Sequence, residues 1–266
     1  MTKLDGLIQW FDGKGAALVA LSGGVDSALV AYAAYQSLRT LSMAVTADYK
    51  TLAQEELDSA RKICREIGIR HIVIQYDELE NSDFVKNDKN RCFHCRTELS
   101  EHLKKIAIKE NINIIVDGTH MDDLGEYRPG IKALKENGIK SPLIEVGFTK
   151  EEIRKEARRA GLSVYDRPSN SCLASRIPWG QRITAERLAR IESCEIMIKQ
   201  LFGIVQVRVR DLGEVAKIEV GPNEIKLLSD KTKLAILDSH LKRNGFESMI
   251  VDPDGYKPGK LNVITD

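Results

Sequence analysis

A short segment near the N-terminus combines the residue types that can hold phosphate groups. Residues 16–21 form an uninterrupted apolar run that predicts a strand buried on both faces, and the sequence SGGVDS follows it directly. The two glycines let the backbone turn sharply and approach a ligand closely, and a helix beginning near the aspartate would aim its free N–H groups at the same turn. We therefore predict a phosphate-binding loop, which is not a P-loop because no Gly-Lys-Ser/Thr follows. Its candidate ligands are Ser22, Gly23, Gly24, Asp26 and Ser27.

The SGGVDS segment resembles the pyrophosphate-binding loop of the ATP pyrophosphatase (PP-loop) superfamily. Members of this superfamily adenylate a carbonyl or carboxylate oxygen with ATP and release pyrophosphate. The resemblance implies that the loop binds the phosphates of Mg²⁺–ATP. For this segment taken alone, an ordinary strand, polar turn and helix remain the alternative.

Three of the five cysteines form a second set that could do chemistry. Cys92 and Cys95 make a CxxC pair, which occurs in metal sites, in redox pairs and by chance. Cys172 lies in a polar loop with no apolar helix face to pack against. A third thiolate would leave a fourth coordination position open, for water on zinc or for an exogenous ligand on one iron of a 4Fe–4S cluster. Spacing alone leaves coincidence, zinc and iron–sulfur open, whereas Cys64 and Cys194 are expected to pack in the core.

Two arginines alternate with a valine in the sequence QVRVRD. Arg208 and Arg210 are two residues apart, so on a strand their side chains share one face. Two guanidinium groups on one face make a good clamp for a phosphate or a carboxylate. An exposed strand with basic side chains is the alternative interpretation of this pattern.

Three segments together carry a closer resemblance. They are EYRPGIKA (126–133), SCLASRIPWG followed by IT (171–184), and VRVRDLGEVAKIEV (207–220). They resemble the LarE family of PP-loop enzymes, which are ATP-dependent sulfur insertases. These enzymes make pyridinium-3,5-bisthiocarboxylic acid mononucleotide, the precursor of the nickel-pincer nucleotide cofactor of lactate racemase. The resemblance extends from the N-terminal helix to the tail.

The resemblance implies a role for each of these residues. Cys172 is the sulfur-handling residue; some members sacrifice its sulfur, and others add a CxxC and are understood to carry transferable sulfide on a 4Fe–4S cluster. Because Cys92 and Cys95 accompany Cys172, this sequence resembles the cluster-bearing type. Arg208 and Arg210 would bind the phosphate of the pyridinium mononucleotide substrate. The implied catalytic residues are Cys172, Asp26, Asp123 and Arg176.

The composition bears on partners and location. The sequence contains 40 Lys and Arg residues against 39 Asp and Glu residues, so a nucleic-acid partner is not expected. This charge balance weighs against the main alternative function, a tRNA thiolase with the same loop and cluster chemistry. No apolar run is long enough to span a membrane, and we expect a cytoplasmic protein with reduced cysteines. The expected partners are the small-molecule substrate, a sulfide donor and further copies of the chain in a homo-oligomer.

The elements that position these residues follow an α/β pattern. Apolar runs at 16–21, 41–47, 71–76 and 112–116 alternate with helical spacing, which predicts a doubly wound parallel sheet of Rossmann-like type. The polar turn 117–123 then falls at the same sheet edge as the SGGVDS loop. Thr149-Lys-Glu-Glu152 is a capping box that opens a charged helix, interpreted as a solvated face. The Pro- and Ser-rich stretch from Asp166 divides a PP-loop domain, 1–167, from a smaller C-terminal α/β domain for substrate and sulfur transfer, 168–266.

Overall fold

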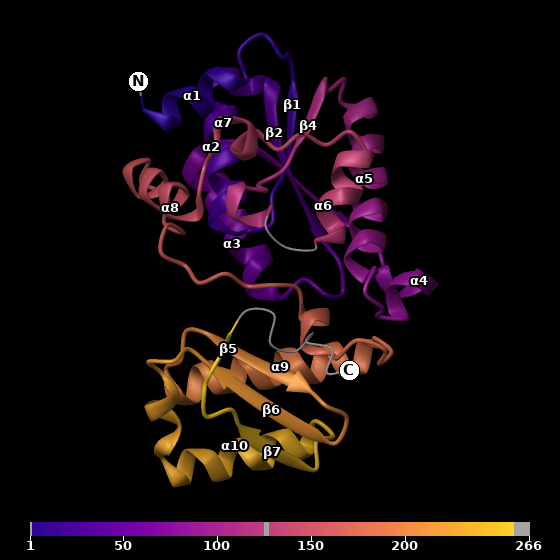
Figure 1. Cartoon of the computed structure of the whole chain (residues 1–266), viewed down its shortest axis with the longest axis vertical. Helices are drawn as coiled ribbons and strands as arrows, with labels where there is room; N and C mark the ends of the chain where they lie inside the picture. The colour runs from indigo at the N-terminus through magenta and orange to yellow at the C-terminus, as the bar shows by residue number, and fades with distance from the viewer. Residues whose placement is uncertain (1, 125–127, 258–266) are drawn as a thin grey trace. The chain divides into compact units, whose positions relative to one another are not determined.

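The computed structural model describes residues 2–124 and 128–257 of the chain (Figure 1). Glu126 and Tyr127 of the EYRPGIKA segment and the end of the tail lie outside these ranges. The chain forms two compact units. The first unit comprises Met1–Asp77 and Asn90–Asn170, and the second comprises Glu78–Lys89 and Ser171–Asp266.

The segment Glu78–Lys89 belongs to the second unit although its sequence neighbours belong to the first. Buried Asn87 holds it there, because its side-chain amide donates to the carbonyl oxygens of Ile177 (3.3 Å), Pro178 (2.8 Å) and Gln181 (2.9 Å). Sequence continuity does not reveal this contact. The division into domains 1–167 and 168–266, with their separate roles, stays a prediction.

The first unit is built on a four-stranded parallel sheet in the order β3-β2-β1-β4, which confirms the predicted α/β fold class. Its strands are β1 (Ala17–Ala20), β2 (Ser42–Asp48), β3 (Arg70–Gln75) and β4 (Ile114–Val116). Its helices are α1 (Lys3–Trp10), α2 (Val25–Leu38), α3 (Gln54–Ile67), α5 (Arg91–Lys109), α6 (Pro129–Glu136), α7 (Pro142–Val146) and α8 (Lys150–Arg159), with 3-10 turns η1 (Arg39–Leu41) and η3 (Met121–Asp123).

Helices cover both faces of this sheet, as a doubly wound fold requires (Figure 1). Ala17 and Val19 of β1 pack into a core shared with α2, α3 and α8, whereas Leu18 packs on the opposite face with α5 and α6. Alternation along β1 thus buries both faces of the strand, which explains why it reads as a continuous apolar run. The carboxyl end of this buried strand carries the SGGVDS loop.

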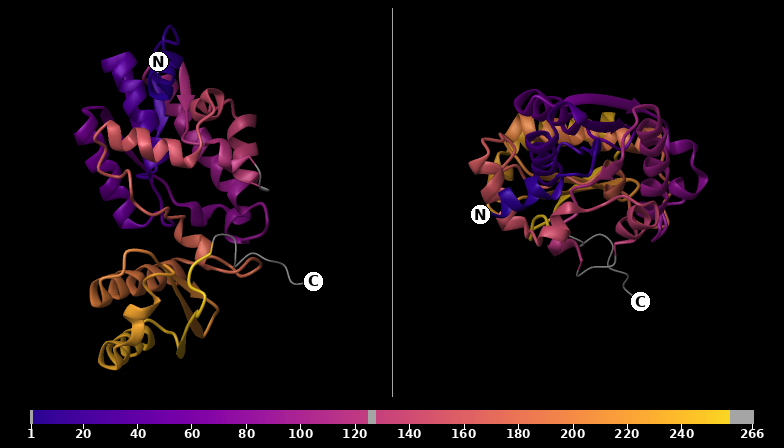
Figure 2. Two further views of the ribbon diagram at one scale, coloured as in Figure 1. Left: turned by 60° about the vertical axis from the view of Figure 1, so that its left-hand side comes forward. Right: turned by 90° about the horizontal axis from the view of Figure 1, so that it is seen from above.

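The second unit, whose C-terminal part is coloured orange to yellow in Figure 2, contains a smaller mixed sheet in the order β5-β6-β7. Strands β5 (Val207–Asp211) and β6 (Val215–Val220) are antiparallel, and β6 and β7 (Ser248–Val251) are parallel. Helices α9 (Ala185–Phe202) and α10 (Lys231–Arg243) share the apolar core of this sheet. The remaining short elements are η2 (Glu78–Glu80), α4 (Ser82–Val85), η4 (Leu173–Arg176) and η5 (Ile225–Ser229). Strand β6, helix α10 and the parallel strand β7 form a β-α-β unit.

One predicted helix of the second unit is wrong. The spacing favours a single helix from Asn223 to Leu241, but the chain forms η5 and then a separate α10. Asp230 interrupts the helix because its carboxylate accepts hydrogen bonds from the N–H groups of Thr232 (2.9 Å) and Lys233 (3.1 Å) and so caps a new helix. Over the described ranges, no helix is both long and apolar enough to cross a membrane.

Candidate active site

The loop Ser22–Ser27, which we call the pyrophosphate loop, is fixed by its own hydroxyl groups. The Ser27 hydroxyl accepts from the N–H of Ser22 at 3.1 Å and donates to the carbonyl of Gly24 at 3.2 Å. Gly23 has φ +85°, and a Cβ there would lie 2.3 Å from the carbonyl oxygen of Glu56 on α3. Only glycine therefore satisfies both the backbone conformation and the close approach of α3 at this position.

The N-terminus of α2 faces this loop without a side-chain cap. Gly24 is the N-cap residue and makes no side-chain capping hydrogen bond. Uncapped N–H groups and the positive end of the helix dipole suit an anion such as a phosphate group. Asp26 lies in this first turn, and both of its oxygens accept from Lys150 Nζ at 2.6 Å.

The polar turn 117–123, which we call the acidic turn, lies against the pyrophosphate loop as expected from the sheet topology. A Cβ on Gly118 would come within 2.6 Å of the backbone nitrogen of Ser27, so the two segments touch. Asp117 accepts hydrogen bonds from Thr119 and from Ser141, and burial raises the pKa of its carboxyl group. The turn is therefore positioned by a buried acid at its base.

His120 connects two predicted site residues. Its ring is almost fully buried, and Nε2 lies 3.9 Å from Asp26 Oδ1 and 3.5 Å from Asp123 Oδ2, while Nδ1 lies 3.8 Å from Asp122 Oδ2. Asp123 also accepts from the backbone N–H of His120 and pairs with Arg128 at 2.7 Å. The structure thus brings Asp26 and Asp123 together around one histidine; their roles stay predictions.

Sequence reasoning missed Lys150. Its position inside a capping box made it look like part of a solvated face, yet its ammonium group binds Asp26 and its backbone N–H donates to Asp122 at 2.7 Å. One signal was available. A lysine in the first turn of a helix interacts unfavourably with the helix dipole. Its presence at the start of α8 therefore indicates a nearby anion.

Cys92 and Cys95 lie one turn apart near the start of α5 and so share a helix face. Cys92 is exposed and Cys95 is half-buried. Gly130 of α6 approaches this turn so closely that a Cβ on it would meet the Cys92 carbonyl oxygen at 3.3 Å and the Arg96 side chain at 3.1 Å. The glycine of the EYRPGIKA segment thus lets α6 pack against the cysteine-bearing turn.

Cys172 lies in the second unit, at the start of η4, and is half-buried. Buried Arg176 organises its loop, residues 171–175: Nη1 donates to the carbonyl oxygens of Ser171 (2.6 Å) and Cys172 (3.1 Å). The other edge of this guanidinium group binds both oxygens of Glu195, at 2.8 and 3.0 Å. Arg176 therefore acts on the backbone that carries Cys172, and its predicted part in catalysis stays a prediction.

The three cysteines do not meet within one unit. Residues 2–124 and 128–257 contain no group of three histidine, cysteine or acidic side chains placed to hold a metal ion. Two thiolates one helical turn apart are nevertheless suitable soft ligands for iron or zinc. The joint use of Cys92, Cys95 and Cys172 stays a prediction. Cys64 and Cys194 are buried in the core, where burial raises the pKa of each thiol to about 12.

Arg208 and Arg210 share one face of β5, on which Tyr256 lies 5.0 and 5.9 Å from their guanidinium groups. Both arginine side chains are buried, so β5 is not an exposed strand that carries basic side chains on its surface. Arg210 donates to Glu219 at 2.8 Å and to the carbonyl of Ser175 at 3.0 Å. Burial, aided by the nearby Arg176 charge, lowers the pKa of Arg208 to about 10. Their predicted contact with a substrate phosphate stays a prediction.

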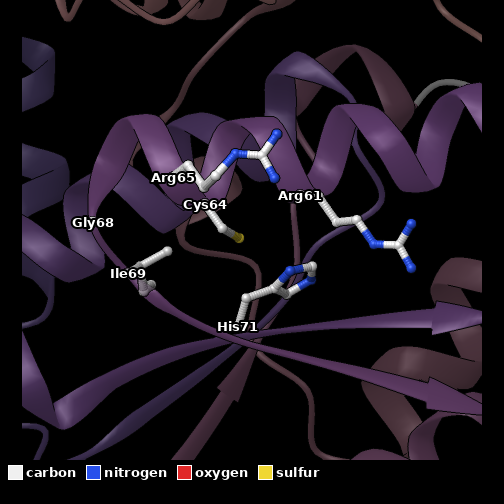
Figure 3. Close-up of a pocket in the computed structure, with 6 residues that line it drawn as sticks. All are labelled: Arg61, Cys64, Arg65, Gly68, Ile69 and His71. Atoms are coloured by element: carbon white, nitrogen blue, oxygen red, sulfur yellow. The ribbon is translucent and has the colours of Figure 1, made fainter.

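A surface hollow of about 360 Å³ lies elsewhere in the first unit, between α3 and β3 (Figure 3). The Cys64 sulfur and the His71 ring point toward one another in it. His71 Nε2 is already hydrogen-bonded to Thr46 at 2.8 Å, and burial lowers the pKa of the ring. Neither group is poised for catalysis. The lining residues are Arg61, Cys64, Arg65, Gly68, Ile69 and His71.

Comparison with known proteins adds independent evidence. Residues 16–102, which include the pyrophosphate loop and the CxxC pair, match the family described as queuosine biosynthesis protein QueC. An uncharacterized protein of Synechocystis sp. is 41% identical over 263 residues, covering 99% of this chain and 98% of that protein. The pyridinium-3,5-bisthiocarboxylic acid mononucleotide synthase of Lactiplantibacillus plantarum is 29% identical, covering 92% of this chain and 88% of the synthase.

A tRNA-specific 2-thiouridylase of Rickettsia typhi is 25% identical over 189 residues, covering 58% of this chain and 53% of that enzyme. The similarity to the thiouridylase is thus partial, whereas the similarity to the Synechocystis protein and the synthase spans both units. The stretch that matches the QueC family contains the pyrophosphate loop. The chain therefore belongs to the LarE family of the PP-loop ATP pyrophosphatase superfamily, a family of ATP-dependent sulfur transferases.

Proposed function

We propose that this protein adenylates the carboxylates of pyridinium-3,5-biscarboxylic acid mononucleotide and converts them to thiocarboxylates, in the biosynthesis of the nickel-pincer nucleotide cofactor of lactate racemase. One observation carries the proposal. A glycine-containing loop followed by an uncapped helix N-terminus, which suits phosphate groups, occurs in a chain that is similar over 92% of its length to a synthase of the corresponding bisthiocarboxylic acid.

The pyrophosphate loop serves the first step. A substrate carboxylate oxygen attacks the α-phosphorus of ATP, and the bond from that phosphorus to the β-phosphate oxygen breaks. The N–H groups at the start of α2 stabilise the charge on the departing pyrophosphate. Asp26 supplies carboxylate oxygens for Mg²⁺, which needs only one or two protein carboxylates when it also binds phosphates. We assign Asp123, on the other side of His120, to the same step.

Sulfur enters in the second step. Adenylation is needed because a carboxylate is a poor electrophile and oxide a poor leaving group. A hydrosulfide attacks the activated carbonyl carbon, the bond to the AMP oxygen breaks, and AMP leaves with one of the original carboxylate oxygens. The thiocarboxylic acid loses its proton to solvent, and a second round converts the other carboxylate.

We assign the substrate phosphate to Arg208 and Arg210. Both guanidinium groups lie on the face of β5 that Tyr256 covers, and Arg210 is oriented by Glu219. A guanidinium group held by a carboxylate keeps a fixed direction for its remaining donors, which suits a charged ligand. Tyr256 adds an aromatic surface next to both cations.

The sulfur-carrying group that we propose is a 4Fe–4S cluster held by Cys92, Cys95 and Cys172. The donor set fits, because thiolates are the ligands that such clusters prefer, and two of the three already lie on one helix face. When bound, the cluster supplies the sulfide for transfer. Arg176 would hold the Cys172 backbone in place for this role. We further propose a cytoplasmic location, a separate sulfide donor and a homo-oligomeric state.

Two alternatives keep the same ATP chemistry. In the first, the acceptor is a tRNA base, which the partial similarity to a 2-thiouridylase favours and the near-zero net charge of +1 disfavours. In the second, Cys172 itself gives up its sulfur and becomes dehydroalanine. That route yields one sulfur per chain, whereas cluster-borne sulfide allows turnover.

The proposal is tested with protein purified and assayed without oxygen. We expect pyrophosphate release from Mg²⁺–ATP to depend on the pyridinium mononucleotide, and mass spectrometry to detect thiocarboxylates in excess of the protein when sulfide is added. Pyrophosphate release that depends instead on tRNA would identify the thiolase. One sulfur transferred per chain, with a matching loss of mass at Cys172, would identify the sacrificial route.

A further inference from the structure

Lys150 places a cation at the pyrophosphate loop that the proposed mechanism has not used. Its side chain is 27% exposed, and its ammonium group is shared equally between the two oxygens of Asp26, which is 25% exposed. The pair is therefore reachable from solvent. It lies at the start of α2, where the uncapped N–H groups are.

The local helix does not explain this lysine. Lys150 is in the first turn of α8, where a cation interacts unfavourably with the helix dipole. The capping box of α8 is completed by Thr149 and Glu152, neither of which needs the Lys150 side chain. The position is instead held by the contact of its backbone N–H with Asp122. The acidic turn thus aims Lys150 at the loop.

We propose that Lys150 is a catalytic residue that binds the pyrophosphate part of ATP; this inference rests on the proposed function. When Mg²⁺–ATP enters, Asp26 turns to the metal ion and Lys150 exchanges the carboxylate for phosphate oxygens. Such an exchange costs little free energy, since a part-exposed ion pair is screened by water and contributes little to stability. Each charged group gains a new partner of opposite sign.

The catalytic effect follows from where negative charge develops. As the carboxylate oxygen bonds to the α-phosphorus, the electron pair of the breaking bond moves onto the β-phosphate oxygen. Lys150 stabilises that oxygen together with the N–H groups of α2, and it neither gains nor loses a proton. Electrostatic contacts aimed at developing charge act mainly on the transition state and the leaving group.

The chain provides a matched control. Lys3 also pairs with the first turn of α8, donating to Glu152 at 2.6 Å, with a side chain that is 41% exposed. Its removal breaks an ion pair of α8 that does not involve the pyrophosphate loop. Lys3→Ala therefore reports the effect of loosening α8, and Lys150→Ala reports that effect plus any contact with phosphate.

The experiment measures binding of inorganic pyrophosphate and of AMP by calorimetry with Mg²⁺, and then pyrophosphate release. For Lys150→Ala we expect pyrophosphate binding about tenfold to a hundredfold weaker, AMP binding changed less than about twofold, and release about a hundredfold slower. Lys150→Arg should recover much of both effects, and Lys3→Ala should match the wild type.

Two results would overturn the inference: unchanged pyrophosphate binding in Lys150→Ala, or an equal loss in Lys3→Ala. Failure of the proposed function is distinguishable. In that case the wild-type protein would bind pyrophosphate through Lys150 and yet form no thiocarboxylate from the mononucleotide.

Discussion

The ion pairs beside the pyrophosphate loop and those behind Cys172 are built differently. Asp26 and Lys150 are 25% and 27% exposed, whereas Arg176 and Glu195 are 0% and 6% exposed. Each pair has two short hydrogen bonds, so hydrogen-bond geometry does not separate them. Burial distinguishes the two pairs, because water screens the charges of the first pair and is excluded from the second.

This difference separates an exchangeable contact from a structural one. A part-exposed pair gains little from its own attraction and can give up a partner to a ligand. A buried pair cannot lose one member without leaving an uncompensated charge. We therefore expect the first unit to respond to substitution mainly in ligand binding and the second, at Arg176 and Glu195, mainly in stability.

The largest effect should come from removing a sulfur ligand. Cys92→Ala, Cys95→Ala and Cys172→Ala should each abolish thiocarboxylate formation by turnover, because each removes one ligand of the proposed cluster, while pyrophosphate release continues. Parallel assays of pyrophosphate and thiocarboxylate on protein prepared without oxygen measure both steps. Undiminished thiolation in any one variant would count against the cluster.

The next largest effect should be the loss of the buried pair. Glu195→Gln leaves Arg176 without its charged partner and should destabilise the second unit by roughly 3–5 kcal/mol. Trp10 and Trp179 belong to different units, so urea unfolding followed by fluorescence in a Trp10→Phe background reports the second unit. Asp26→Asn, which breaks the part-exposed pair, should destabilise the first unit by no more than about 1 kcal/mol, measured in a Trp179→Phe background in which Trp10 reports that unit. Equal losses of unfolding free energy in Glu195→Gln and Asp26→Asn would contradict the distinction between the buried and the part-exposed ion pair.

The pH dependence sharpens the same test. Burial alone would favour the neutral form of Glu195, but the Arg176 charge prevails and lowers the pKa of this carboxyl group. Its contribution to stability is therefore complete above the unfolded value of about 4.3 and is lost as the pH falls through the lower folded value. The stability difference between wild type and Glu195→Gln should shrink only in that acid range. A difference that narrows near neutral pH would contradict the assignment.

A smaller effect is expected at Arg208, whose replacement should weaken binding of the mononucleotide by about tenfold or more and leave ATP affinity unchanged. Titration of each ligand separately, with Arg182→Ala as a basic-residue control in the same unit, measures the two affinities. A loss of ATP affinity with unchanged mononucleotide binding would remove Arg208 from the substrate site.

Much of the fold was predictable, because alternating apolar strands and helices fix a doubly wound sheet and put the pyrophosphate loop at its carboxyl edge. The loop itself needed only local information: a buried strand, a glycine at positive φ and a helix start. Contacts between distant segments were not predictable. Lys150 meets Asp26 across 124 positions, and Asn87 fixes its segment to carbonyl groups 90 or more positions away. No periodicity or capping rule encodes such pairs.

Burial of charge was the other feature hidden in the sequence. The QVRVRD pattern predicts two arginines on one face of a strand, and the structure confirms this. The pattern does not predict that Glu219 and Tyr256 lie against those arginines. The pattern specifies which side chains share a face and leaves open what covers that face. The sequence could nevertheless have flagged Lys150, since a lysine at a helix start opposes the dipole.

The central claim, that a substrate carboxylate is activated as its adenylate before sulfur enters, has one direct test. The mononucleotide is labelled with heavy oxygen in its carboxylates, and the AMP formed during thiolation is analysed by mass spectrometry. The account predicts one heavy oxygen in the phosphate of each AMP released, because AMP departs with the oxygen that attacked the α-phosphorus. Unlabelled AMP, or ADP as the nucleotide product, would contradict it.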